Sequence, residues 1–308
     1  MTRTSESAWT VAVVGAGIIG KQIALQVALQ GFRTIVHDAD RRVLDRFEED
    51  AREYPERILK ERWYLFRGPQ DQLARLQSAA ARMTFDDRIE AVADCNLVIE
   101  AVPEIAKIKQ DLFSQLNARC PADVLFATNT SSISPSDLAE STGRADRFGG
   151  LHFSLGNQMV EVMPHAGCSA ETFETLVWFA ELVARPLIVC RRESRGGALN
   201  PMIMSLNGSA LDLALEGVAD PVDLDRAFMK SFGAKIGPFG SLDAIGLDLA
   251  MAINEVMYET ESDLKYRRRA EYLRQHVERG RLGLKSGIGF YRYPGAAFQQ
   301  PGFADGRV

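Results

Sequence analysis

The sequence has few cysteines, and their spacing does not indicate a common function. Cys95, Cys120, Cys168 and Cys190 are scattered along 308 residues, without CxxC spacing or neighbouring groups of histidines. Neither a disulfide framework nor a zinc site is therefore indicated. We expect reduced cysteines that lie mostly in the core, and no bound metal ion.

Long apolar runs and long runs of like charge are missing as well. No apolar stretch approaches the roughly 18 residues that a membrane helix needs, and residues 1–10 lack the basic-then-apolar pattern of a signal peptide. The 36 basic and 41 acidic residues give a formal charge of −5 without a block of one sign. We expect a cytoplasmic protein that acts on a small molecule and has neither nucleic-acid nor membrane partners.

What the sequence does contain is a glycine-rich segment near its start. The apolar, β-branched run 10–14 leads into GAGIIG and then into a helical apolar pattern. In this context the first glycine permits a tight turn, the second leaves room for a pyrophosphate, and the third lets helix and strand pack closely. The helix amino terminus then faces the phosphates. The residues predicted to bind a dinucleotide here are Gly15, Gly17, Ile18, Ile19 and Gly20.

The second predicted strand ends in an acid, Asp38. This residue follows Gly20 by 18 positions, close to the roughly 20 at which the ribose-binding acid of such units is found. A carboxylate there accepts hydrogen bonds from ribose hydroxyls and repels a 2′-phosphate, so NAD is favoured over NADP. Arg41 and Arg42 follow and could meet such a phosphate, but a solvated helix face explains them more simply.

Strand and helix patterns alternate through the first two thirds of the chain and then stop. Residues 41–81 read as helices, which we interpret as a helical hairpin inserted near 41–85 that projects from the sheet. Its basic residues could touch an acidic ligand, although a solvated face is favoured: Arg57, Lys60, Arg62 and Arg67. The pattern predicts an α/β, Rossmann-type doubly wound domain over 1–195 and a smaller all-α domain over 196–308, with a frayed tail beyond Pro294.

A second cluster indicates chemistry. Ser131 lies in a turn between a buried strand and a helix start, His152 lies on the next strand, and Glu161 lies on an alternating strand after it. Ligands collect at the carboxyl ends of parallel strands. An imidazole suits proton transfer at neutral pH, and a carboxylate on its other nitrogen would orient it.

Each of these residues also has a purely structural interpretation. Ser131 and His152 could satisfy only local hydrogen bonds, and Glu161 could face solvent. Asn200, which precedes Pro201, could be only the N-cap of a helix.

Taken together, the motifs resemble the 3-hydroxyacyl-CoA dehydrogenases, including members such as 3-hydroxybutyryl-CoA dehydrogenase and lambda-crystallin. The resemblance is carried, in family order, by GAGIIG, CNLVIEAVPE with Lys109, ATNTSS, GLHF followed by MVEV, GALNP, GPFGSLDAIGLD and GLKSGIGFY. It implies an NAD-dependent oxidoreductase of fatty acid metabolism, with a Rossmann domain followed by an all-α domain that forms a homodimer.

The resemblance also implies residue roles. His152 matches the catalytic base and Glu161 the acid that pairs with it. Ser131 matches the serine that hydrogen-bonds the substrate hydroxyl beside the nicotinamide, and Asn200 matches the asparagine that holds the substrate carbonyl. The residues that match further cofactor contacts of the family are Asp38, Glu104, Lys109 and Lys285.

Two departures from the family pattern leave the substrate open. The segment FSLGNQ at 153–158 is shorter than the usual loop and lacks its Asn-Pro pair, and Asn200-Pro201 replaces the usual Asn-Arg. The first hypothesis is a short 3-hydroxyacyl thioester, on CoA or an acyl carrier, oxidised reversibly to the 3-oxo form. The second is a free hydroxy acid or sugar acid, as for the L-gulonate 3-dehydrogenase branch. The third is a non-catalytic NAD-binding protein.

Overall fold

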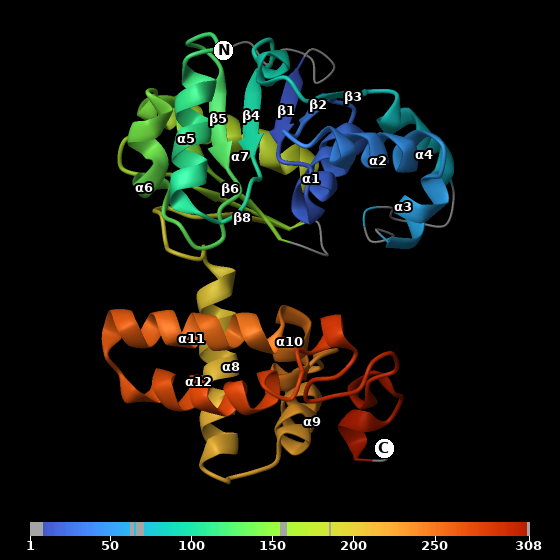
Figure 1. Ribbon diagram of the computed structural model, residues 1–308, viewed down its shortest axis with the longest axis vertical. Helices are drawn as coiled ribbons and strands as arrows, with labels where there is room; N and C mark the ends of the chain where they lie inside the picture. Colours follow the sequence, from blue (N-terminus) through green and yellow to red (C-terminus); the bar gives the residue numbers. More distant parts are fainter. Residues whose placement is uncertain (1–8, 62–64, 66–70, 155–158, 185, 307–308) are drawn as a thin grey trace. The chain divides into compact units, whose positions relative to one another are not determined.

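The computed structural model describes residues 9–61, 65, 71–154, 159–184 and 186–306. The chain forms two compact units, Met1–Asn200 and Pro201–Val308 (Figure 1). Each unit is described below by itself. The expected domain boundary after residue 195 lies a few residues before this division.

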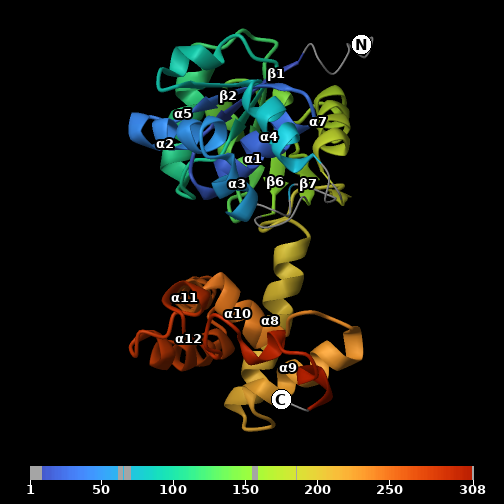
Figure 2. The same cartoon turned by 90° about the vertical axis from the view of Figure 1, so that its right-hand side faces the viewer.

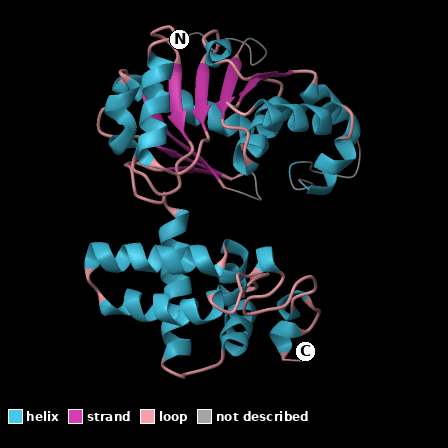
Figure 3. Cartoon of the chain, viewed as in Figure 1, coloured by secondary structure: helices cyan, strands magenta, loops and turns pink. Residues whose placement is uncertain are grey.

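The first unit is built on a sheet with flanking helices (Figure 3). The described residues form eight strands in the order β3-β2-β1-β4-β5-β6-β7-β8. The strands are β1 Thr10–Val14, β2 Arg33–His37, β3 Met83–Asp86, β4 Leu97–Glu100, β5 Leu125–Thr128, β6 Phe148–Phe153, β7 Val160–Met163 and β8 Leu187–Val189. All neighbours are parallel except β6 and β7, which are antiparallel. The strand order reverses between β1 and β4, as in doubly wound α/β folds.

Helices cover both faces of this sheet. The α-helices of the first unit are α1 Ile18–Leu29, α2 Arg41–Arg52, α3 Pro55–Glu61, α4 Gln72–Ala80, α5 Ala106–Asn117, α6 Pro135–Ala139 and α7 Ala170–Val183. Its 3₁₀ helices are η3 Ile89–Val92, η4 Glu140–Thr142 and η5 Ala145–Arg147. Because strands covered on both faces lose their contact with water, β4 and β5 are buried at every position.

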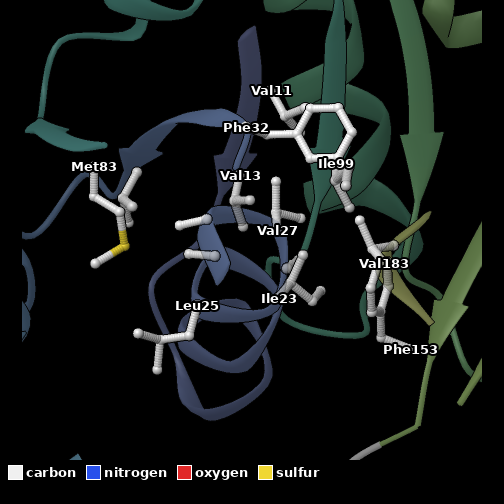
Figure 4. Packing of buried hydrophobic residues seen from close by; sticks show 14 of the residues in the cluster. Val11, Val13, Ile23, Leu25, Val27, Phe32, Met83, Ile99, Phe153 and Val183 are labelled. Atoms are coloured by element: carbon white, nitrogen blue, oxygen red, sulfur yellow. The ribbon is translucent and has the colours of Figure 1, made fainter. Parts of the chain in front are cut away.

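Alternate residues of β1 face the two halves of the core. Val11 and Val13 belong to a cluster that contains α1, α4 and α7, whereas Ala12 and Val14 belong to one that contains α5. Figure 4 shows the first cluster, with Val13 near Val27. The period of two in side-chain direction therefore divides one short apolar run between two helical layers.

The region 41–85 differs from the expected hairpin. Its described residues contain the three α-helices α2, α3 and α4 and then β3, which pairs with β2 at one end of the sheet. Leu44, Phe47, Leu76 and Ala79 are buried in the same cluster as β1, so these helices form part of the core and do not simply project from the sheet. The strand β3, with the sequence MTFD, was not expected, because its alternation of apolar and polar residues spans only four positions. Residues 62–64 and 66–70 lie outside the described part of the chain.

The second unit is helical. Its α-helices are α8 Leu199–Leu215, which begins just before the division, α9 Pro221–Phe232, α10 Pro238–Ile245, α11 Leu247–Glu261 and α12 Leu264–Val277, and its 3₁₀ helices are η6 Leu284–Ser286, η7 Ala297–Gln299 and η8 Phe303–Asp305. Figures 1 and 2 both show α11 and α12 side by side. Among the described residues, no helix is long and apolar enough to cross a membrane.

The expected frayed tail beyond Pro294 is wrong. Ala296, Phe298 and Phe303 are buried with residues of α8 to α12 in the core of the second unit. The ring of Tyr291, just before this segment, packs edge-to-face against the ring of Phe298, with 5.0 Å between the two ring centroids. The prediction failed because polar residues and glycines dominate the sequence of the tail, so its few buried aromatic residues were not recognised as core residues.

Two buried acids hold the segment after α12 against the helices through hydrogen bonds. Asp225 of α9 accepts the hydroxyl of Tyr291 at 2.8 Å and two backbone N–H groups at the start of α10. Asp243 of α10 accepts the backbone N–H groups of Phe290 at 2.9 Å and Tyr291 at 2.8 Å. The motifs GPFGSLDAIGLD and GLKSGIGFY are therefore tied to each other, since Asp243 belongs to the first and its donors belong to the second.

Candidate active site

The candidate site lies at the carboxyl edge of the parallel strands. The glycine turn follows β1, Asp38 follows β2, Glu100 ends β4, and Asn129 follows β5. His152 is the last but one residue of β6. Because these five strands run in one direction, their ends meet at one edge of the sheet, where ligands bind in doubly wound folds.

The glycine turn has the geometry that a pyrophosphate needs. Gly15 has a φ of +104°, and a Cβ there would lie 2.5 Å from the carbonyl oxygen of Ala101. A Cβ on Gly20 would overlap the carbonyl oxygen of Gly15, whereas one on Gly17 would meet no atom within 4 Å. The space above Gly17 and the unpaired N–H groups at the start of α1, which begins at Ile18, suit a dinucleotide.

Asp38 is held beside this turn. Its Oδ2 atom accepts the N–H of Ala16 at 2.7 Å, and its Oδ1 atom accepts the N–H of Asp40 at 2.9 Å. The carboxylate thus joins the glycine turn to the start of α2. Each carboxylate oxygen can accept more than one hydrogen bond, so ribose hydroxyls can still be bound.

The arginines considered above as ligands for an acidic group are paired with acids on exposed surfaces. These pairs are Arg41 with Asp45 at 2.7 Å, Arg42 with Asp40 at 2.8 Å and Arg57 with Asp50 at 3.0 Å. The pairs favour the solvated-face interpretation of these residues. Lys60 is exposed, and Arg62 and Arg67 lie outside the described residues.

A buried ion network lies next to the glycine turn. The side chain of Lys109 is 1% exposed, and its Nζ atom lies 2.6 Å from Glu100 Oε1 and 3.2 Å from Glu104 Oε2. Glu100 is fully buried and also accepts the hydroxyl of Thr128 at 2.6 Å. Burial raises the pKa of Glu100, against the lowering effect of the Lys109 ammonium. Lys109 is therefore enclosed by protein carboxylates, which leaves its ammonium little surface for a ligand.

Glu104 organises the turn that carries Ser131. One oxygen, Oε1, accepts the Thr130 hydroxyl at 2.6 Å and the N–H groups of Ser131 at 2.9 Å and Ser132 at 2.7 Å. Burial by itself would raise the pKa of Glu104, but these donors and Lys109 outweigh it and lower the pKa to about 2. Ser131 is exposed, and within the described residues its hydroxyl has no hydrogen-bond partner. The hydroxyl therefore does not serve to stabilise the turn.

His152 and Glu161 form a pair across two strands. They lie opposite each other in the antiparallel ladder of β6 and β7, and Nδ1 of His152 is 2.7 Å from Oε2 of Glu161. His152 is 7% exposed and Glu161 is fully buried, so the solvent-facing interpretation of Glu161 is wrong. Since the carboxylate accepts, Nδ1 donates, and in a neutral imidazole Nε2 is then an acceptor.

The second oxygen of Glu161 binds backbone. Its Oε1 atom accepts the N–H of Ala198 at 2.7 Å and of Leu199 at 3.0 Å, at the start of α8. Burial alone would raise the pKa of Glu161, but the hydrogen bonds from His152 and from these two N–H groups lower it below its usual value. The acid is thus ionised in the resting protein.

Two further expected residues lie on α8 and in the second unit. Asn200 is in the first turn of α8, which begins at Leu199, so Asn200 is not the N-cap of this helix. In the described part of the chain its side chain has no hydrogen-bond partner. Lys285 belongs to the second unit, where its ammonium pairs with Asp248.

Some residues of this site were not expected from the sequence. Glu100, Thr128 and Thr130 hold the network around Lys109, and the backbone of Ala198 and Leu199 holds Glu161. The signal for Glu100 was a lone acid at the end of an apolar strand, since a charge at such a place needs a partner. Backbone donors leave no such signal.

Comparisons with known proteins agree with this geometry. The model of the 3-hydroxyacyl-CoA dehydrogenase NAD binding domain matches residues 10–194, and that of the 3-hydroxyacyl-CoA dehydrogenase C-terminal domain matches residues 196–293. A probable 3-hydroxybutyryl-CoA dehydrogenase of Deinococcus radiodurans is 36% identical over 284 residues, which cover 91% of this chain and 99% of that protein.

Two solved structures give the same picture. A diketoreductase, described as acting on dicarbonyl compounds, has a TM-score of 0.81 at 35% identity and covers 92% of this chain and 99% of its own. The (S)-3-hydroxybutyryl-CoA dehydrogenase of Ralstonia eutropha has a TM-score of 0.81 at 30% identity with the same coverage. These matches confirm the expected family, fold class, enzyme class and cofactor. The chain belongs to the 3-hydroxyacyl-CoA dehydrogenase family of NAD-dependent oxidoreductases.

Proposed function

We propose that the chain oxidises the 3-hydroxyl of a short 3-hydroxyacyl thioester, on CoA or an acyl carrier, reversibly to the 3-oxo form, with His152 as general base. The observation that carries this proposal is the contact of 2.7 Å between His152 and the buried Glu161. The names of the relatives, two of which are 3-hydroxybutyryl-CoA dehydrogenases, support the substrate class.

Each of the proposed catalytic residues has a separate role in the reaction. Nε2 of His152 takes the proton of the substrate hydroxyl, and the Glu161 carboxylate stabilises the imidazolium that forms. The free hydroxyl of Ser131 holds the substrate oxygen, and the Asn200 amide holds the thioester carbonyl. NAD, when bound, supplies the hydride acceptor.

The cofactor contacts are proposed for the same edge of the sheet. Gly15, Gly17, Ile18, Ile19 and Gly20 line the pyrophosphate, and Asp38 binds the adenosine ribose. We propose that Glu104 and Lys109 act mainly through the Ser131 turn, since Glu104 accepts the N–H of Ser131 and pairs with Lys109. Lys285 stays a predicted cofactor contact, and 1–195 and 196–308 stay the predicted functional domains.

We propose further that the second unit forms a homodimer in the cytoplasm. Several of its large apolar side chains are exposed, among them Met202 at 69%, Val218 at 62% and Phe232 at 75%. A folded monomer would leave these groups in water at a cost in free energy. Sedimentation of a monomer at micromolar concentration would contradict this proposal.

A second candidate function is the oxidation or reduction of a free hydroxy or oxo compound. The diketoreductase structure at 35% identity favours it, because that protein is described with dicarbonyl substrates. An absorbance assay at the NADH band separates the candidates, with 3-hydroxybutyryl-CoA, a carrier-bound 3-hydroxyacyl group, L-gulonate and, in reverse, a small diketone. NAD and NADP are compared in parallel. Turnover of free compounds alone selects the second candidate, and NAD binding without any turnover selects a non-catalytic protein.

The base is tested with His152→Ala. We expect kcat to fall by about 10²- to 10⁴-fold, while the Kd for NAD, measured by NADH fluorescence, changes little. The matched control is His165→Ala, because His165 is also 7% exposed and lies in the first unit, yet among the described residues its ring forms hydrogen bonds with backbone groups only. Near-normal turnover of the His152 variant would contradict the assignment.

A further inference from the structure

The segment between β8 and α8 closes around the carboxylate of Glu161. Gly197 has a φ of +68°, and a Cβ built on it would overlap Oε2 of Glu161 and lie 2.9 Å from Oε1. The next two residues, Ala198 and Leu199, donate their N–H groups to Oε1. A glycine is therefore required here both for its backbone conformation and for the space it leaves.

The same segment is anchored to the first unit at two other points. The N–H of Cys190 donates to the carbonyl oxygen of Val162 at 2.9 Å, on the strand that carries Glu161. Glu193 accepts the N–H of Ser136 at 2.9 Å, at the start of α6, and also pairs with the hydroxyl of Ser136. The turn at Gly197 is thus held on a fixed path past the carboxylate.

We infer that the turn at Gly197 is a positioning device for the His152–Glu161 pair. The inference rests on the proposed role of His152 as base. The two N–H groups fix the rotation of the carboxylate, so that only Oε2 is turned toward Nδ1 of His152. With Nδ1 they form three donors around a fully buried acid, which needs such partners to stay charged.

The turn also fixes the distance between base and substrate-binding amide. Asn200 follows Leu199 directly, and Leu199 is bonded to Glu161. The orientation of the imidazole and the position of Asn200 are therefore set by one turn. A substitution in the turn at Gly197 therefore displaces both the imidazole and Asn200. The glycine turn at 15–20 is not affected, because it forms its hydrogen bonds with His37 and Asp38.

The first test is Gly197→Ala. We expect kcat to fall by about 100-fold, the effect of misplacing a catalytic group by roughly 1 Å, while the Kd for NAD changes little. The matched control is Gly217→Ala, because Gly217 has a φ of +69° and a Cβ there meets no atom within 4 Å. Both variants bear the same backbone strain, and only the first disturbs Glu161.

A spectroscopic readout separates positioning from folding. The chain has 4 histidines, so ¹⁵N-histidine labelling gives few signals, and His152→Asn identifies that of His152. We expect the bonded Nδ1–H signal of His152 in the parent and in Gly217→Ala, and its loss in Gly197→Ala.

A second variant removes one donor without adding a side chain at Gly197. Leu199→Pro deletes one N–H at the first position of α8, where proline is well accepted. Compared with Leu199→Ala, which keeps the N–H, we expect kcat to fall by about tenfold, the value of one hydrogen bond to a charged group.

The inference is overturned if Gly197→Ala loses no more turnover than Gly217→Ala and keeps the Nδ1–H signal, or if Leu199→Pro equals Leu199→Ala. These results differ from a failure of the proposed function, in which His152→Ala itself keeps its turnover.

Discussion

Both units of the chain bury carboxylates, but they surround them with different partners. In the first unit the buried Glu100 and the partly exposed Glu104 meet the Lys109 ammonium, and the buried Glu161 meets His152. In the second unit the described residues place only N–H groups and tyrosine hydroxyls around Asp225 and Asp243. The first group lies at the edge of the sheet where doubly wound folds bind ligands, whereas the second holds one chain segment on another.

The two groups also differ in part in the direction of their pKa shifts. Burial raises the pKa of Asp225 and of Asp243 in spite of their hydrogen bonds. Burial likewise raises the pKa of Glu100 in spite of the Lys109 ammonium, whereas for Glu104 and Glu161 burial is outweighed and the pKa is lowered. Among these five acids a lowered pKa therefore occurs only beside a cation or an imidazole, and Glu100 shows that such a partner does not always suffice.

The sharpest test of this comparison is Lys109→Met. It leaves Glu100 buried without its cation, so we expect the free energy of unfolding to fall by about 3–5 kcal/mol. Urea denaturation followed by tryptophan fluorescence reports the first unit, because Trp9, Trp63 and Trp178 all lie there. The matched control is Lys107→Met, whose side chain is 77% exposed and pairs with Asp111. Equal losses in the two variants would mean that the network does not stabilise the unit.

A smaller effect is expected for Asp243→Asn in the second unit. The amide has one acceptor oxygen, so one of the N–H groups of Phe290 and Tyr291 loses its partner, at a cost of about 1–3 kcal/mol. Hydrogen exchange of peptides from 283–293 measures the loss. Asp223→Asn is the control, since the side chain of Asp223 is 63% exposed. Unchanged exchange would show that Asp243 does not fasten this segment.

The smallest expected effect is a difference between the units on acidification. Glu104 has a pKa of about 2 in the fold against 4.5 in the unfolded chain, so the stability it contributes is lost as the pH falls from 4.5 toward 2. Asp225 and Asp243 have raised pKa values, as does Glu100 in the first unit, so the unfavourable contribution of these three acids disappears as they take up protons. Hydrogen exchange of both units, corrected for the intrinsic effect of pH, should show acid weakening the first unit more. The opposite order would contradict the comparison.

Motifs that act through local chain geometry could be predicted from the sequence. The glycine turn, Asp38 and the pair of His152 with Glu161 lie at the expected edge of the sheet. A glycine fingerprint combines a turn and a helix start within a few residues, so little else is needed to recognise it.

Features that depend on distant backbone could not be predicted. Residue type does not record that Ala198 and Leu199 donate to Glu161, because every residue except proline carries the same N–H group. Lys109 is another example, since a lysine on a helix is usually exposed and this one is buried by two acids. Residues 155–158, in the segment that is shorter than in the family, lie outside the described part of the chain.

The antiparallel pairing of β6 and β7 has a consequence for how such enzymes diversify. His152 and Glu161 face each other through the strand register, so a one-residue shift within β7 would turn Glu161 to the opposite face of the sheet. Residues added to or removed from the connection between the two strands leave this register intact. The proton-transfer pair can therefore stay unchanged in evolution while the connection between β6 and β7 changes in length. We expect relatives that act on different substrates to differ first in the length of that connection.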